Sequence, residues 1–401
     1  MDRLPPPAPD ASTAGGMSRG ATLDAAAAVA AHRAGWDALA LEAPARLPML
    51  GPTWVDAYAR HRLDDGETLR VHVATSGPRV VGVLPVVEAP SRLGARLRAP
   101  HDGHTRAGDL LVAADAPAAD AASIVRAAFG AVPGARALTL CGVRDGSRTP
   151  AALAAARLDA TVVEADDGRG SFVDVREPLA ALRARLPDNF RRNVRKAGNR
   201  LAREAGVAFR FLEGAQATPD GLAAFLGVEA SGWKGRAGTA IAADPRLVAF
   251  YRALAEGFHR EGRLEWHRLE IGGEVAAVHF AVRWGRSLVL AKIAYDERFA
   301  RLGPGNLLFE RLLERETQAG RADEVNCLTD MPWHRHWAMP QAAYRRLTVV
   351  PRRALAWATV AAPAGLREAA KRVPLLRTIV RRLRGEPARP SDADGGEGSD
   401  A

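Results

Sequence analysis

The chain has 401 residues, 47% of them hydrophobic and 25% charged, which is typical of a soluble globular protein with two or three domains. Its formal net charge is +10, but residues 352–384 alone carry nine basic side chains against one acidic side chain, Glu368. Because the excess charge lies mostly in that segment, we expect no DNA partner for the rest of the chain.

Cysteine and hydropathy patterns exclude several other classes. There are only two cysteines, Cys141 and Cys327, and no Cys/His cluster has metal-site spacing, so we expect neither a disulfide framework nor a bound metal. No apolar run is long enough to span a bilayer, and the N-terminus lacks the apolar segment of a secretory signal. These features favour a cytoplasmic protein.

In chain order, the same pattern of predicted helices and strands occurs twice. The first half has a helix at 54–61, strands at 69–74 and 79–87, and a strand at 137–143. The second half has a helix at 249–262, strands at 263–271 and 274–282 joined by Gly272-Gly273, and strands at 287–295 and 324–328. We predict a mixed α/β (α+β) fold of two related domains, 21–168 and 169–351, each a mostly antiparallel sheet flanked by helices. Residues 1–20 and 386–401 are expected to be disordered.

The second half opens with a basic helix within 186–206. Phe190, Val194, Ala197 and Leu201 form its apolar stripe, with Asp188 as the expected cap and Gly206 as the expected stop. Its other faces are almost wholly basic. They are either a solvated surface or an anion-binding surface, for which the candidates are Arg192, Arg195 and Lys196.

A glycine-rich turn lies between the strand 287–295 and a helix with one apolar face. It contains Leu302, Gly303, Pro304, Gly305 and Asn306. Free backbone N–H groups and the helix dipole at such a turn suit a phosphate. The alternative is an ordinary turn from strand to helix.

Four segments together resemble a known family. They are FRRNVRK (190–196), EASGWKGRAGTAI (229–241), LEIGGEVAAVHFAV (269–282) and AYDERFARLGPGNLLFE (294–310). In this order they resemble the CelD-like acetyltransferases of the GNAT superfamily, which are related to the FemAB-type peptidyltransferases. The resemblance covers about 186–350 and implies two tandem GNAT-like domains, of which the first is degenerate.

The resemblance also implies a donor. Acetyl-CoA or another acyl-CoA would place its pyrophosphate on Leu302, Gly303, Gly305 and Asn306. The superfamily signature has Gln or Arg in its first position, whereas this chain has Ala300 there, with Arg301 one place later. This departure admits the FemAB-like alternative, in which aminoacyl-tRNA is the donor.

Candidate catalytic residues follow from the same resemblance. The fourth strand of a GNAT domain splays and offers a backbone N–H to the thioester, and we equate it with 274–282. His279 on this strand and Glu229 are candidate bases, and Tyr295 can protonate the leaving thiolate. Each also has a structural alternative: His279 as a core histidine, Glu229 as a residue at a helix end, and Tyr295 as an anchor at a strand end.

The acceptor side is expected to involve four further residues. Trp233 and Lys234 beside Glu229 suit a sugar or a polar amine. Asp330 and His334 follow the last predicted strand of the domain, where active-site loops gather. The expected reaction is transfer of an acyl group to an amine or hydroxyl of a sugar or cell-envelope precursor.

The basic segment 352–385 interleaves arginines with apolar residues. It is expected either to pack on the core or to lie on the anionic inner face of a membrane. A membrane-associated polysaccharide-assembly factor without enzymatic activity is therefore a further alternative.

Overall fold

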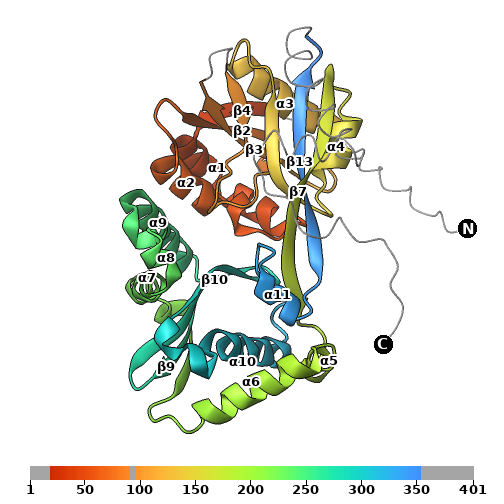
Figure 1. Cartoon of the computed structure of the whole chain (residues 1–401). Helices are drawn as coiled ribbons and strands as arrows, with labels where there is room; N and C mark the ends of the chain where they lie inside the picture. Colours follow the sequence, from red (N-terminus) through yellow and green to blue (C-terminus); the bar gives the residue numbers. More distant parts are fainter. Residues whose placement is uncertain (1–18, 91–94, 354–401) are drawn as a thin grey trace, which may run out of the picture.

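The structure is a computed structural model that describes residues 19–90 and 95–353. Figure 1 shows two lobes, one above the other. The upper lobe is built mainly from the first part of the chain, and we call it the first lobe. Its elements are β1 (Arg19–Asp24), α1 (Ala25–Glu42), η1 (Pro48–Leu50), α2 (Pro52–His61), β2 (Thr68–Ser76), β3 (Arg79–Ala89), β4 (Arg96–Arg98), β5 (Leu111–Val112), α3 (Ala118–Ala131), β6 (Leu138–Arg144) and α4 (Thr149–Ala155).

The lower lobe is built from the second half and is called the second lobe. Strand β7 (Ala160–Asp174) leads into it. Its elements are α5 (Leu179–Ala184), α6 (Asp188–Leu201), β8 (Ala208–Glu213), η2 (Gly214–Gln216), α7 (Gly221–Ser231), α8 (Trp233–Arg236), η3 (Ile241–Ala243), α9 (Pro245–Arg260), β9 (Leu264–Ile271), β10 (Glu274–Trp284), β11 (Ser287–Tyr295), η4 (Glu297–Leu302), α10 (Pro304–Ala319), β12 (Glu324–Asn326) and α11 (Pro332–His336). The last described strand, β13 (Gln341–Pro351), returns to the first lobe.

One hydrogen-bonded sheet runs through both lobes. Across the described residues its order is β1-β2-β3-β4-β6-β13-β7-β12-β11-β10-β9-β8, with β5 added beside β3. All pairs are antiparallel except β4 with β6 and β11 with β12. The predicted fold class, a mixed α/β fold with a mostly antiparallel sheet flanked by helices, is confirmed.

Strands β7 and β13 connect the two lobes (Figure 1). From Ala160 to Ser171, β7 pairs with β13, and its last residues, Phe172–Asp174, pair with β12 of the second lobe. On its other edge β13 pairs with β6. The predicted domain boundary at 168/169 thus falls inside a continuous strand, and the end of the described chain completes the sheet of the first lobe.

Most predicted elements are present, with small differences at their ends. The basic helix runs from Asp188 to Leu201 rather than to Gly206. Asp188 is its first residue and not the predicted cap, because Pro187 stands at the N-cap. Val194 and Leu201 of its apolar stripe are buried. Arg19 and Gly20, which the prediction placed in a disordered N-terminus, belong instead to β1, where they pair with β2. The basic segment beyond Arg353 lies outside the described residues.

The lobes meet through an apolar contact between α2 and α9. The ring of Trp54 lies 5.8 Å from that of Phe250 in an edge-on arrangement. The backbone of Gly257 comes so close to Thr53 that a Cβ at this glycine would lie 2.5 Å from the Thr53 side chain. Because both aromatic rings are fully buried, one hydrophobic core continues from one lobe to the other.

A buried ion pair also joins the lobes. Arg144, on β6, donates to both carboxylate oxygens of Glu324, on β12, over 2.8 and 2.7 Å. Ser287 and Asn326 donate to the same carboxylate, and these contacts hold the pKa of Glu324 below its usual value despite burial. Both carboxylate oxygens of Glu324 therefore accept hydrogen bonds, as a buried charge requires.

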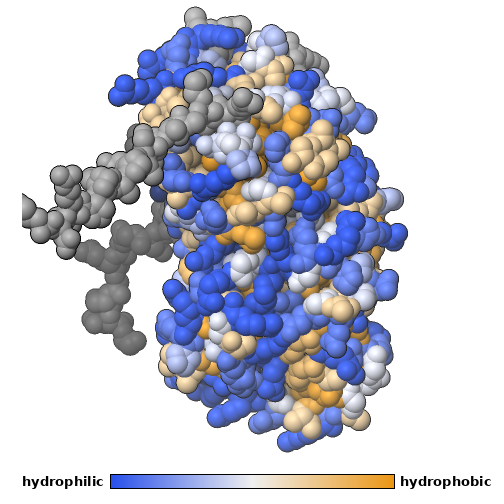
Figure 2. All heavy atoms as spheres, turned by 180° about the vertical axis from the view of Figure 1, so that it is seen from behind, coloured by the Kyte–Doolittle hydropathy of each residue, from blue (hydrophilic) through white to orange (hydrophobic). Residues whose placement is uncertain are grey.

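Figure 2 shows hydrophilic residues over most of one face, with hydrophobic residues in scattered groups. Of the helices that the structure describes, none has the length and hydropathy to cross a bilayer.

Candidate active site

A gap opens in the sheet of the second lobe where β11 leaves β12. The two strands pair only from Ser287 to Val289, whereas β11 continues to Tyr295 with β10 as its only partner among the described strands. The predicted splayed strand, 274–282, is therefore wrong. It is β10, which pairs with β9 on one edge and β11 on the other. The strand that leaves its neighbour is instead β11, the next strand along the chain.

The 3-10 helix η4 follows this splayed strand, and the glycine-rich turn lies at the end of η4. Gly303 has φ +62°, in the left-handed region that glycine adopts at little cost, and α10 begins at Pro304 without a side-chain cap. The first amides of a helix have no partner within it, so those of Gly305 and Asn306 remain available to a ligand. Tyr295 lies beside the turn, because a Cβ at Gly305 would be 3.7 Å from its ring. The Leu302 side chain packs inward instead, against the apolar cluster between α6 and α10.

The basic helix α6 packs against this turn and against α10. A Cβ at Gly303 would lie 3.3 Å from that of Ala197, and Arg200 donates to the Arg301 carbonyl over 2.7 Å. Lys196, which precedes Ala197 in the chain, is exposed. Phosphate groups bound at the turn would therefore meet positive charge from α6.

Arg192 and Arg195 lie nearer the start of α6 than the residues that contact the turn. They line a groove together with Arg183 and Glu310, between α5, α6 and α10. Both are exposed. The structure thus divides the predicted anion-binding residues between the turn and this groove.

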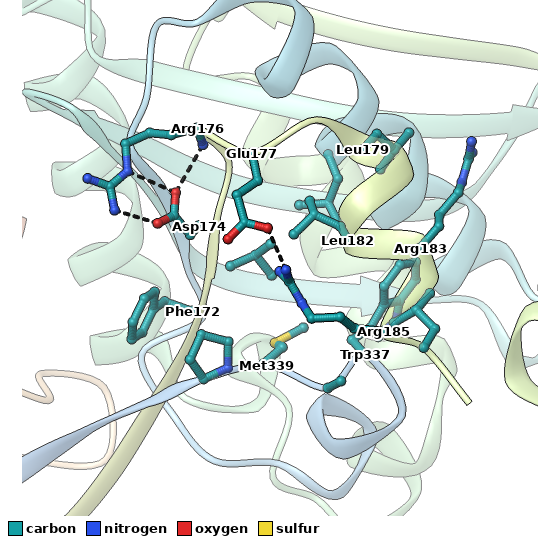
Figure 3. A pocket seen from close by; sticks show the side chains of 15 residues that line it. Phe172, Asp174, Arg176, Glu177, Leu179, Leu182, Arg183, Arg185, Trp337 and Met339 are labelled. Carbon is teal, nitrogen blue, oxygen red and sulfur yellow. Dashed lines mark hydrogen bonds and ion pairs between the residues drawn. The ribbon is translucent and has the colours of Figure 1, made fainter. Parts of the chain in front are cut away.

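A neighbouring cavity of about 520 Å³ lies between α5, the end of β7 and the segment after α11 (Figure 3). Leu182, Trp337 and Met339 line it, and at its margin Arg176 pairs with Asp174 and Arg185 with Glu177. Trp337 also donates its indole N–H to Asn306 Oδ1 over 3.1 Å. This apolar cavity is therefore linked to the glycine-rich turn by one shared side chain.

On the side of the second lobe that meets the first lobe, Glu229 is buried at the end of α7. Its Oε1 accepts from Lys234 Nζ over 2.7 Å and its Oε2 from the Ile241 amide over 2.8 Å. The structure thus brings together the predicted Glu229 and Lys234. Trp233 is the first residue of α8, between them in the chain.

Lys292, which the sequence analysis did not select, lies near this pair. It is on the splayed part of β11, and its Nζ is 5.7 Å from the centre of the Tyr251 ring. Burial and the nearby charge of Lys234 lower the pKa of Lys292 to about 8. A lone lysine in the otherwise apolar strand SLVLAKIAY was the signal that could have revealed it.

The first lobe approaches the same place with the loop between β4 and β5. His104 Nδ1 is 2.9 Å from the Tyr251 hydroxyl, and burial lowers the pKa of His104 to about 4. Asp102 accepts from Arg62 over 2.8 Å and from the His104 amide over 2.7 Å. Two residues of the first lobe, His104 and the hydrogen-bonded carboxylate Asp102, thus face the second lobe's Glu229, Lys234, Lys292 and Tyr251.

His279 lies on the opposite face of the sheet. Its neighbour in the chain, Phe280, packs on Tyr251, whereas the His279 ring lies 5.7 Å from that of His267. His279 Nδ1 is buried without a hydrogen-bond partner among the described residues. Burial and His267 hold the pKa of His279 far below its usual value.

The two remaining predicted residues differ in exposure. Asp330 is exposed, whereas His334 is buried in α11, and its Nδ1 accepts from the Met331 amide over 3.0 Å. Burial lowers the pKa of His334 to about 4. Within residues 19–90 and 95–353 no group of His, Cys, Asp and Glu has the arrangement of a metal site.

Comparisons with known proteins identify the class. Residues 188–335 match the family model described as an acetyltransferase (GNAT) domain. No protein of curated function matches the sequence. Three solved structures share the fold over most of the chain. They are FemX (10% identity, 79% of this chain and 95% of that chain, TM-score 0.57), the C-terminal domain of an Agrobacterium fabrum protein described as a lysylphosphatidylglycerol synthetase (14%, 86% and 96%, 0.51), and a Bacteroides thetaiotaomicron protein of unknown function (13%, 80% and 97%, 0.51).

Residues 188–335 thus form an acyltransferase domain of the GNAT type. The resemblance predicted from the four sequence segments is confirmed for the domain: residues 188–335, in the second lobe, carry a GNAT acetyltransferase domain, and the chain shares its fold with FemX and with the lysylphosphatidylglycerol synthetase domain.

Proposed function

We propose that the protein transfers an acyl group from acyl-CoA to an amine or hydroxyl of a sugar or cell-envelope precursor. One observation carries the donor assignment. A strand that leaves its neighbour after Val289 is followed, after the short 3-10 helix η4, by an uncapped helix N-terminus at Gly303-Pro304-Gly305. The backbone groups of β11 beyond Val289 are not paired with β12 and are proposed to face the pantetheine and acyl group, and the turn offers backbone amides to the pyrophosphate.

The acceptor is proposed to enter between the lobes. Glu229, Lys234 and Lys292 face His104 and Asp102 there, so the site can hydrogen-bond a polar molecule from both sides. Asp330 and the exposed parts of α6 remain candidates for additional acceptor contacts. His334, by contrast, is used within α11, so we propose for it a positioning role in that helix.

Gly305→Asp tests the donor assignment. The change adds a negative charge where the pyrophosphate is proposed to bind, and its Cβ would make an ordinary contact with Tyr295, so the fold is expected to survive. A ligand that binds only the native state raises the melting temperature by mass action. We expect acetyl-CoA or a longer acyl-CoA to raise the Tm of the natural protein but not that of Gly305→Asp.

Gly227→Asp is the matched control. It adds the same charge on α7, at a position where a Cβ meets no atom within 4 Å. This variant should respond to acyl-CoA like the natural protein. Absence of a Tm shift in the natural protein with millimolar acetyl-CoA and a series of longer acyl-CoAs would contradict the donor assignment.

The FemAB-like alternative has its own support. The exposed cations Arg192, Arg195 and Lys196 on α6, and the fold shared with FemX, are compatible with an aminoacyl-tRNA donor. Phosphate contacts make tRNA binding steeply salt-dependent. Filter binding of tRNA to the natural protein and to the Arg192→Gln, Arg195→Gln, Lys196→Gln triple variant, at several salt concentrations, distinguishes this donor from acyl-CoA.

The membrane-associated alternative depends on residues 352–385, most of which lie outside the described residues. We propose peripheral binding to the anionic inner face of a membrane through this segment. Flotation with vesicles containing anionic lipid, for the full chain and for a chain ending at Arg353, tests it. If neither chain floats, the membrane contact is contradicted.

A further inference from the structure

Lysine is rare in this chain compared with arginine. Of 56 lysine and arginine residues only Lys196, Lys234, Lys292 and Lys371 are lysines, and two of these four come together between the lobes. Arginine stays charged at any pH that a protein tolerates, whereas a lysine amine becomes neutral when burial disfavours its charge. A site that needs a neutral amine must therefore use lysine.

We propose that Lys292 is a catalytic residue, whose neutral amine takes the proton from the attacking amine or hydroxyl of the acceptor. The inference rests on the proposed acyl-transfer function and adds to it the identity of the base. None of the sequence-based candidates, His279, Tyr295 and Glu229, is this residue.

The backbone places Lys292 where the reaction is proposed to occur. It follows Val289, the last residue of β11 that pairs with β12, and precedes Tyr295 on the same splayed segment. In register it lies opposite Phe280, which packs on Tyr251, so the Lys292 side chain is on the sheet face that meets the first lobe. The Lys292 amine lies over the Tyr251 ring.

The nearby acids are already engaged. Glu229 accepts from Lys234 and from the Ile241 amide, and Asp102 accepts from Arg62 and from backbone amides. Within the described part of the chain, Lys292 has no carboxylate within ion-pair distance.

The charged neighbours from all surrounding elements are Lys234 and Glu229 from α8 and α7, Tyr251 from α9, and Asp102, His104 and Arg106 from the β4–β5 loop. Burial and the positive charges of Lys234 and Arg106 disfavour the ammonium form, while Glu229 and Asp102 oppose this effect only in part. The pKa of about 8 leaves a useful fraction of neutral amine near neutral pH.

The proton balance is simple. Neutral Lys292 Nζ takes a proton from the acceptor, whose nitrogen or oxygen forms a bond to the acyl carbonyl carbon. The C–S bond then breaks and CoA leaves as a thiolate, which takes a proton from water or from the Tyr295 hydroxyl. Lys292 returns its proton to solvent, so the products are acyl-acceptor and CoA thiol.

Two substitutions separate a base from a simple positive charge. Lys292→Met removes both functions, whereas Lys292→Arg keeps the charge but cannot act as a base. We expect both variants to lose about 10²-fold or more in kcat/KM, as loss of a general base does. The assay is release of CoA thiol from acetyl-CoA and longer acyl-CoAs with a panel of amino sugars. A Lys292→Arg variant within tenfold of the natural rate would overturn the proposal.

A second readout needs no turnover. Reductive ¹³C-dimethylation labels the lysines, and the Lys292 resonance is the one missing from Lys292→Arg. We expect it to titrate with a midpoint near 8, and we expect Lys234→Met to raise that midpoint because it removes a neighbouring charge.

A midpoint near 10.4, the usual lysine value, in an enzyme that turns over would overturn the role of Lys292 alone. No turnover by the natural protein with any donor and acceptor of the panel would instead overturn the proposed function, and the role of Lys292 with it.

Discussion

The indole Nε1 of Trp337 donates to Asn306 Oδ1 over 3.1 Å, and this contact connects the segment after α11 to the first turn of α10. The Trp337 ring also packs edge-on against Phe309, at 5.0 Å, and Phe190, at 5.2 Å. The side chain beside the proposed pyrophosphate site is thus oriented by an aromatic cluster that spans α6, α10 and α11.

Trp337→Phe should weaken binding of the acyl-CoA donor with little loss of packing. The ring contacts persist in part, but the Asn306 amide loses its hydrogen bond, which is worth about 0.5–1.5 kcal/mol. We expect the Kd for CoA, measured by calorimetry, to rise about two- to tenfold. Trp333→Phe, at a tryptophan within α11 that does not bond Asn306, is the control and should leave the Kd unchanged.

Glu229→Gln should destabilise the fold through Lys234. The substitution removes the charge partner of the ammonium, and a hydrogen bond to a charged group contributes about 1.5–3 kcal/mol. Because Lys234 is partly exposed, we expect a loss in the lower part of this range. A double-mutant cycle with Lys234→Met, followed by urea unfolding, measures the coupling; additive effects would show that the pair contributes nothing.

Glu324→Gln should cost much more, about 3–5 kcal/mol, because it leaves Arg144 buried without its charge partner. The pKa of folded Glu324 is depressed, so its stabilisation is present above the usual pKa of 4.5 and is lost as the pH falls below it. Glu164→Gln, in the exposed pair with Arg345, is the control and should change the unfolding free energy by less than about 0.5 kcal/mol.

His334 should make stability fall in mild acid. Unfolded histidine binds a proton near pH 6.5, but His334 in the folded state does so only near pH 4, because its Nδ1 is buried and accepts from Met331. Between these values the unfolded state holds more protons, so stability decreases as the pH falls. His334→Asn keeps an acceptor near the Nδ1 position. Urea unfolding from pH 4 to 7.5 should show a shallower slope for this variant, and equal slopes would contradict the assignment.

Local patterns in the sequence predicted the elements well because each depends on nearby residues. The Gly272-Gly273 hairpin and the apolar stripe with Val194 and Leu201 are examples. The splayed strand was misassigned because splaying depends on how far β11 pairs with β12, and these strands meet only in the folded sheet. Lys292 was missed because its significance depends on Lys234 and on a loop of the first lobe, which only the folded chain brings near.

The insertion of β13 between β6 and β7 constrains how the protein is made. In the described structure β6 and β7 do not pair with each other, so the gap between them stays open until Gln341 and the residues after it leave the ribosome. Domains usually fold in order from the N-terminus during translation. Here the first lobe cannot finish before the second has been translated, so the nascent first lobe must hold two unpaired strand edges, open to pairing with other chains, while the residues between β7 and β13 are made.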